Sequence, residues 1–306
     1  TLMNIERIHK KVIGWLIVLL IVSIAACRKT TETVADENNN NGSLQPQSGR
    51  LAYADTLFYN RPLSADTFAA VVSQPAGTVV FKSIPGGLVI DSVTGRINIS
   101  KSESGIRYKV FAVNQQGLAI DSVKLVLSGI DYADGIYNLD ATPVAYDTAF
   151  PIYNATPGLA LPCDDDDDDE QDLCVFDETD LDGDGNDDIN GVIQDKLLVD
   201  IKRGTIDLEA SFRAGLFGSS NPANGSLKNL TMYYRLGDAS NKALQKIQLQ
   251  VYYFRTTTDI PQSLLNELNI RRNQSTQVNG RFTRTAEFES YLKPKRPPIL
   301  IIVGGI

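Results

Sequence analysis

Short apolar runs separated by turn residues fill the chain from residue 51 to about residue 130. The runs are rich in β-branched side chains, nearly alternate between apolar and polar positions, and are separated by Gly, Asn and Ser. Turns at intervals of about 8 to 12 residues are typical of β-sandwiches. The expected strands cover residues 78–81, 88–90, 96–99, 108–113 and 123–127. We therefore expect a first β-sandwich over residues 51–130.

The β-like pattern continues over residues 131–306, where we expect a second, β-sandwich-like domain. The expected strands are two around a turn within 197–212, then 230–236, 244–256 and a buried terminal strand at 299–303. One short helix is expected near residue 260, because Asp259 can cap a helix and Pro261 suits its first turn. Leucines at positions 264, 265 and 268 would form its apolar face. The fold class is therefore mainly all-β.

The segment before the first sandwich has a different character. Three basic residues precede an uncharged run of 15 residues (12–26), which is shorter than the roughly 20 apolar residues of a membrane-spanning helix. The run ends in Ile24-Ala25-Ala26-Cys27, which resembles the lipobox of bacterial lipoproteins. This resemblance implies that residues 1–26 are a signal peptide and that Cys27 is lipidated. An ordinary signal peptide or a short membrane anchor is the alternative.

Residues 27–50 are expected to comprise the lipidated cysteine and a flexible tether. They are polar and include a run of four Asn at 38–41, so they cannot bury apolar surface. Lipidation would place the protein in the cell envelope, anchored to the outer membrane through its acyl chains. Surface-exported lipoproteins of the Bacteroidota type usually carry a denser acidic signal after the cysteine. Both the periplasmic face and the cell surface therefore stay open.

Two segments of the first sandwich resemble a known module. Residues 85–91 followed by Thr94-Gly95-Arg96-Ile97 are similar to the PxGLxID…TGxI signature of bacterial Ig-like, cadherin-like modules. Residues 105–114 are similar to the GxYxVxVxAxN strand of the same modules. The Thr-Gly pair supplies a turn that needs positive φ. The resemblance implies an Ig-like domain over residues 51–130 that serves as a spacer or adhesion unit and contributes no catalytic residue.

Negative charge is concentrated in one segment of the chain. Removal of residues 1–26 takes away three of 29 basic and one of 37 acidic residues, which leaves 26 and 36. Residues 164–188 contain 15 of these acidic residues and no Lys or Arg. The rest of the chain is mildly basic, but it has no basic stripe interleaved with aromatic residues. We therefore expect no nucleic-acid partner.

Cys163 and Cys174 bracket the first part of this acidic segment. With Cys27 lipidated, they remain as a pair in an oxidising compartment, which favours a disulfide over two free thiols. Seven consecutive carboxylates at 164–170 lie between them and are explained by a solvated loop or by a bound cation. We expect an acidic, Cys-bracketed insertion at residues 163–190.

The end of the insertion carries the spacing of a calcium loop. Alternate Asp side chains can converge on one hard cation where Gly185 allows a sharp turn. The expected ligands are Asp180, Asp182, Asp184, Asn186 and Asp188. The pattern resembles the DxDxDG repeat of EF-hand-like, dockerin and thrombospondin type-3 loops, which implies a structural Ca²⁺ site. Gly191 stands where an EF-hand has its bidentate Glu, so we expect a weaker site completed by backbone carbonyls and by Asn190 or Asp195. A solvated acidic turn is the alternative.

The sequence gives little support to catalysis. The single histidine, His9, lies in the expected signal peptide, so the mature chain would lack His-dependent triads and His-ligated zinc. A hydrolase that uses two carboxylates needs no histidine. The candidates for such a pair are Asp200, Asp207, Glu209 and Asp238, but Asp207 and Glu209 alternate with apolar residues as the solvated face of a strand would.

We therefore predict a protein that is not an enzyme. Its expected role is non-catalytic: binding or adhesion to a glycan or envelope protein partner, or a structural part of a surface complex, with calcium as a stabilising cofactor. A carboxylate-dependent glycan hydrolase, or another polysaccharide-utilisation component, is the second hypothesis. A purely structural spacer is the third.

Overall fold

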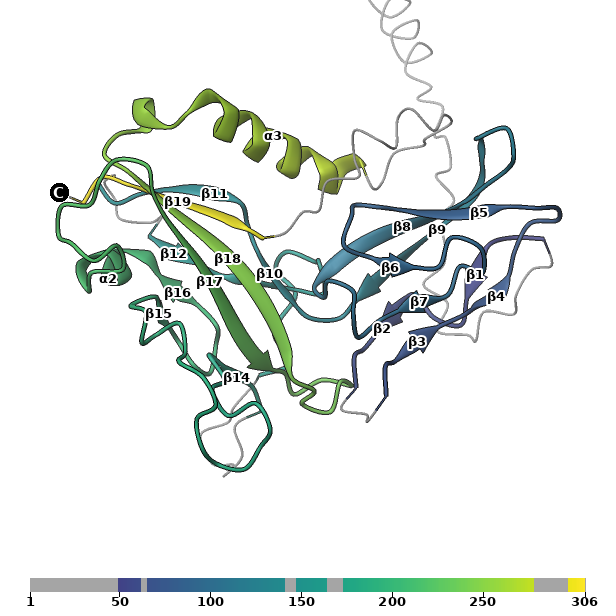
Figure 1. Ribbon diagram of the computed structural model, residues 1–306, viewed down its shortest axis with the longest axis horizontal. Helices are drawn as coiled ribbons and strands as arrows, with labels where there is room; N and C mark the ends of the chain where they lie inside the picture. The colour runs from purple at the N-terminus through teal and green to yellow at the C-terminus, as the bar shows by residue number, and fades with distance from the viewer. Residues whose placement is uncertain (1–48, 62–64, 141–146, 164–172, 278–296, 306) are drawn as a thin grey trace, which may run out of the picture. The chain divides into compact units, whose positions relative to one another are not determined.

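A computed structural model describes residues 49–61, 65–140, 147–163, 173–277 and 297–305 (Figure 1). The expected signal peptide, Cys27, the tether and the acidic run 164–170 lie outside the described residues. Residues 46–306 form one compact unit, which we treat below as two modules. The N-terminal module carries strands β1 to β9, and the C-terminal module begins at β10 (Ile130–Tyr132).

The N-terminal module is built from short strands, as the apolar runs predict. They are β1 (Ala52–Tyr53), β2 (Leu57–Phe58), β3 (Phe68–Ala69), β4 (Val71–Ser73), β5 (Val80–Ile84), β6 (Val89–Ile90), β7 (Ile97–Asn98), β8 (Ile106–Val113) and β9 (Ala119–Leu127). One sheet has the order β2-β9-β8-β5, a second has the order β3-β7-β6, and β1 pairs with β4. Apolar residues from all three sheets form one core, with Phe81, Ile97 and Tyr108 among them. The expected β-rich fold, with several sheets around one core, is confirmed.

The C-terminal module is organised around a mixed five-stranded sheet. Its order is β11 (Gly135–Asn138), β19 (Ile299–Val303), β18 (Gln245–Phe254), β17 (Ser226–Arg235) and β14 (Val175–Phe176). The expected terminal strand at 299–303 is thus present, and it lies inside the sheet between β11 and β18 and runs parallel to both neighbours. Parallel neighbours need a crossover connection, and α3 (Gln262–Gln277) lies on the connection between β18 and β19.

Both faces of this sheet are covered, which explains the continuous apolar run of β19. On one face, Leu264 and Leu268 of α3 pack with Ile299 and Ile301 (Figure 1). On the other face, the core joins the sheet to α2 (Leu208–Arg213) and to the small sheet β12 (Thr148–Ala149), β16 (Ile206–Asp207) and β15 (Leu198–Val199). A strand buried on both faces has no polar alternation.

Two local expectations are wrong. Residues 208–212 form α2 instead of continuing a strand, because Asp207 acts as an N-cap and accepts a hydrogen bond from the Ala210 amide at 2.7 Å. The described residues therefore contain two α-helices where we expected one short helix. Asp259 does not cap α3: it ends a 3₁₀ turn (Thr257–Asp259) and accepts the Thr256 amide at 3.0 Å.

Candidate metal site

Three carboxylates of the acidic loop (residues 177–188) come together. Asp180, Asp182 and Asp188 each offer an oxygen atom, and these oxygens lie within 4.8 Å of one another. Asp182 and Asp188 are exposed, and Asp180 is half-buried. This exposed Asp triad is able to hold a metal ion, since oxygen ligands from carboxylates suit hard cations.

Backbone amides hold the first carboxylate in place. Asp180 accepts hydrogen bonds from the amides of Gly183 at 2.7 Å and Gly185 at 2.8 Å. Both glycines have positive φ, 83° and 90°, which turns the chain around the carboxylate. The hydrogen bond from Gly185 is the largest cause of the lowered pKa of Asp180. Asp180 is therefore oriented and ionised, as a metal ligand has to be.

The other expected ligands divide into two groups. Asp188 closes the loop by accepting the Leu181 amide at 2.8 Å. Asp184 is not part of the triad: its Oδ1 accepts the backbone amide of Asn186 at 2.8 Å and the side-chain amide of Asn186 at 3.0 Å. The structure thus brings together Asp180, Asp182 and Asp188 of the five expected residues, and it pairs the other two with each other.

An arginine that the sequence analysis missed fastens the loop to the sheet. Arg235, at the end of β17, donates from Nε to Glu178 at 2.8 Å, and its Nη2 reaches the carbonyls of Asp180 at 3.2 Å and Leu181 at 3.3 Å. The side chains of Arg235 and Glu178 are largely buried, 22% and 15% exposed. Because Val175 pairs with Arg235, the strand pairing of β14 and β17 sets this contact.

A second missed residue explains the departure from the EF-hand pattern. Asp177 has a φ of 59° and accepts the amides of Val192 at 2.6 Å and Ile193 at 3.0 Å. A Cβ on Gly191 would collide with the Asp177 carboxylate. The twelfth position of the motif therefore needs glycine for close approach, which accounts for the missing Glu ligand.

The acidic loop lines a polar cleft. This cleft has a volume of about 620 Å³ and is bordered by Asp180 and Asp182 on one side. Asn60, Asp66 and Ser100 of the N-terminal module border it on the other. Ser100 Oγ donates to Asn60 at 2.8 Å, and Asp66 pairs with Lys101 at 2.8 Å. Both modules thus contribute polar groups to one cavity.

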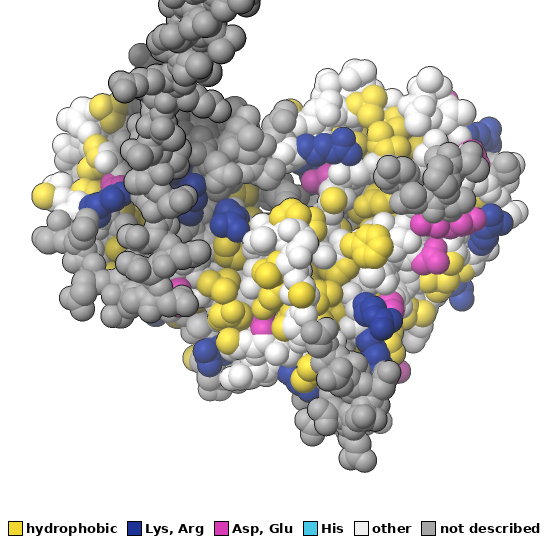
Figure 2. Space-filling view, turned by 180° about the vertical axis from the view of Figure 1, so that it is seen from behind, with side chains coloured by type: hydrophobic (Ala, Val, Ile, Leu, Met, Phe, Trp, Pro, Cys, Tyr) yellow, Lys and Arg dark blue, Asp and Glu magenta, His cyan; other side chains and the backbone are white. Residues whose placement is uncertain are grey.

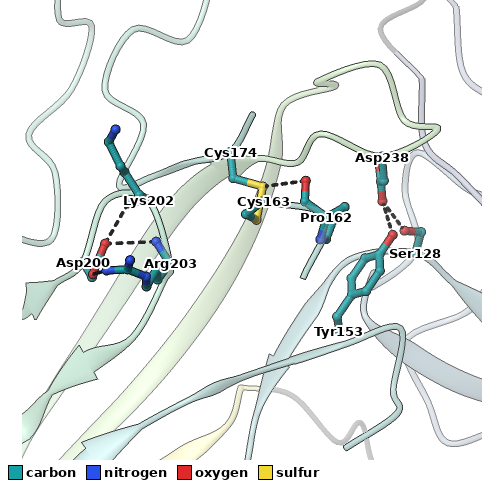
Figure 3. The surroundings of a disulfide bond; sticks show 9 residues. All are labelled: Ser128, Tyr153, Pro162, Cys163, Cys174, Asp200, Lys202, Arg203 and Asp238. Atoms are coloured by element: carbon teal, nitrogen blue, oxygen red, sulfur yellow. Dashed lines mark hydrogen bonds and ion pairs between the residues drawn. A yellow bond between two sulfur atoms is a disulfide. The ribbon is translucent and has the colours of Figure 1, made fainter. Parts of the chain in front are cut away.

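The expected disulfide is present. Cys163 and Cys174 are bonded with an S–S distance of 2.07 Å, and Cys174 is buried (Figure 3). Cys174 directly precedes β14, so the bridge lies at the start of an edge strand of the main sheet. Within the part of the chain that the structure describes, no helix is long and apolar enough to cross a membrane.

The four carboxylates considered for hydrolysis all have local structural partners. Asp200 accepts the amides of Lys202 at 2.9 Å and Arg203 at 3.0 Å, as drawn in Figure 3. Asp207 caps α2, and Glu209 pairs with Arg213 one turn later. Asp238 accepts two side-chain hydroxyls and one backbone amide. These bonds give each carboxylate a role in holding the fold.

Comparison with known proteins assigns no family to this chain. No family profile and no curated protein matches this chain. One similar solved structure comprises extracellular domains 3–5 of Drosophila OTK, with 12% identity, 66% of this chain covered and a TM-score of 0.20. The match spans 60% of the length of that chain. This match assigns neither a fold nor a family to the chain.

Proposed function

We propose that the chain is a lipid-anchored cell-envelope protein with a non-catalytic binding or structural role, and that its acidic loop holds a stabilising Ca²⁺. The observation that carries the proposal is the preformed loop. Asp180 is fixed by glycine amides, Asp188 closes the turn, and Arg235 fastens the start of the loop to the sheet. Such preorganisation lowers the ordering cost of cation binding.

Calcium is the cation that the site suits best. Ca²⁺ takes six to eight oxygen ligands in a flexible geometry, whereas Mg²⁺ demands a near-octahedral arrangement and retains its waters. Three carboxylates on a turn, two of them exposed, leave room for water and backbone carbonyls in the remaining positions. An isolated site without a bidentate Glu is expected to bind weakly, in the range of extracellular modules, roughly 10⁻⁴ to 10⁻³ M.

The binding role draws on two surfaces. The polar cleft beside the acidic loop has the size of a small-molecule or oligosaccharide site. Figure 2 also shows hydrophobic side chains gathered on one face, with Lys and Arg in separate groups rather than in a continuous stripe. Phe150, which is 66% exposed, is one of the large apolar side chains that water reaches. These features favour a glycan or envelope protein partner over a nucleic acid.

The role is tested by separating binding from hydrolysis. Purified protein is passed over immobilised envelope polysaccharides, and saturable retention and release of reducing sugar are both measured. Retention without released sugar supports the binding role. Sugar release that one Asp or Glu substitution outside the acidic loop abolishes would establish the hydrolase instead, with Asp200 and Asp238 as the first positions to substitute.

The lipid anchor is tested independently of the ligand. Live cells expressing the full chain are labelled with palmitate, and a Cys27→Ser variant serves as the control. Label on the wild-type chain that the variant lacks supports the anchor. An unlabelled, freely soluble wild-type chain contradicts both the anchor and the envelope location.

A further inference from the structure

The segment that joins the two modules is buried along its whole length. Every residue from Leu125 to Tyr132 is buried, including Ser128 and Gly129 between β9 and β10. A linker that allows modules to move is normally exposed and polar. Burial of this segment therefore indicates that the modules are coupled through specific contacts.

Asp238 makes the first set of contacts. Its Oδ2 accepts hydrogen bonds from Ser128 Oγ and from the Tyr153 hydroxyl, both at 2.8 Å (Figure 3). Its Oδ1 accepts the Ser240 amide at 2.8 Å, which holds the turn between β17 and β18. One carboxylate thus connects the linker, β13 (Pro151–Tyr153) and that turn.

Tyr234 makes the second set of contacts. Its hydroxyl lies 3.1 Å from Ser104 Oγ of the N-terminal module and accepts the Ile130 amide at 3.2 Å. It also donates to Gln245 at 3.2 Å. A Cβ on Gly129 would approach the Tyr234 hydroxyl to 2.7 Å and Ser104 Oγ to 2.8 Å, so the linker passes against these groups with no space for a side chain.

The disulfide loop supports the turn that carries Asp238. A Cβ on Gly237 would approach the carbonyl oxygens of Pro162 at 2.8 Å and Leu173 at 2.9 Å. These two residues immediately precede Cys163 and Cys174, and the disulfide holds them together. Gly237 is therefore seated against the disulfide loop one residue before Asp238.

We propose that Asp238 and Tyr234 fix the two modules as one rigid body, with the disulfide loop holding the Asp238 turn in position. Asp238 is a positioning residue of this junction. Because Asn60 and Asp66 on one module face Asp180 and Asp182 on the other, the junction also sets the width of the polar cleft. The protein consequently presents its acidic loop and its N-terminal sheets at a constant mutual orientation.

Hydrogen exchange of the full chain tests the proposal. In an Asp238→Ala variant, the amides of peptide 125–132 should exchange about tenfold faster or more, because hydrogen bonds to a charged acceptor at the junction are lost. Amides of β19, which pairs on both sides within the five-stranded sheet, should keep their wild-type rates. Asp91→Ala is the matched control: it removes a carboxylate that also accepts two turn amides, those of Val93 and Thr94, in the turn between β6 and β7 of the N-terminal module.

A milder variant keeps the test decisive if Asp238→Ala does not fold. Ser128→Ala removes one donor and should raise exchange of the same peptide by a smaller factor, about three- to tenfold. Selective acceleration at 125–132 supports the proposal. Equal rates in Ser128→Ala, Asp91→Ala and wild type, or an equal acceleration across 125–132 and β19, would overturn it.

Discussion

Substitution of Asp182 by Asn offers the sharpest test of the cation site. Asp182 belongs to the triad but contributes little to the loop itself, since its Oδ1 accepts one amide, that of Asp184, at 3.1 Å. An Asn side chain keeps this acceptor and removes the charge. Asp180 is less suitable, because three backbone amides depend on its carboxylate. Asp184→Asn is the matched control, as Asp184 caps the next turn in the same way but lies outside the triad.

The expected magnitude follows from linkage. For a dissociation constant of roughly 10⁻⁴ to 10⁻³ M, about 10 mM Ca²⁺ adds about 1.4 to 2.7 kcal/mol to the free energy of unfolding. For a protein of this size, each kcal/mol raises the melting temperature by about 2 to 4 °C, so the total shift is about 3 to 11 °C. Asp182→Asn should lose most of this shift, and Asp184→Asn should retain it.

Differential scanning calorimetry with calcium and with chelator measures the effect. The comparison within each variant cancels the change in stability that the substitution itself causes. A wild-type melting temperature that is equal with calcium and with chelator would refute the site. Equal calcium shifts in wild type, Asp182→Asn and Asp184→Asn would show that any effect arises elsewhere.

Two further predictions concern stability. Asp134 lies 3.6 Å from the buried Arg271 of α3 and accepts the Ile299 amide. Asp134→Asn should therefore lower the free energy of unfolding, measured with urea, by about 3 to 5 kcal/mol. Glu267 pairs with the same Arg271 but is 43% exposed, so Glu267→Gln should lower it by about 1 kcal/mol or less. An equal loss of stability in the two variants would contradict the burial of the Asp134–Arg271 pair. Replacing Cys163 and Cys174 together by Ser should cost roughly 3 kcal/mol by loop-closure entropy, and free thiols in a non-reducing mass measurement of wild type would exclude the bridge.

The strands were predictable because their signal is local. The run 299–303 is apolar and β-branched, and β8 alternates around Tyr108, so each favours a strand wherever it is placed. The same local information failed at α2. Residues 206–209 alternate in a way that suits a strand, yet Phe212 stacks on Tyr253 at 5.2 Å in the core, and that packing favours a helical turn after the Asp207 cap.

In the candidate site, too, contacts between neighbouring residues were predictable from the sequence and long-range contacts were not. Asp180, Asp182 and Asp188 lie within nine residues, so their convergence follows from the spacing of acids and glycines in one loop. Arg235 is 55 residues from Asp180 along the chain, and it meets the loop because β14 pairs with β17. Sequence spacing carries no information about a contact of that range.

The sequence alone thus determined the β class of the chain, the Cys163–Cys174 pair and the location of the acidic loop, because each depends on neighbouring residues. Tertiary structure alone decided that β19 lies between β11 and β18 in a mixed sheet and that Asp238 binds the linker between the two modules. Both outcomes depend on segments that are at least 49 residues apart, and only the packing of the whole chain brings such segments together.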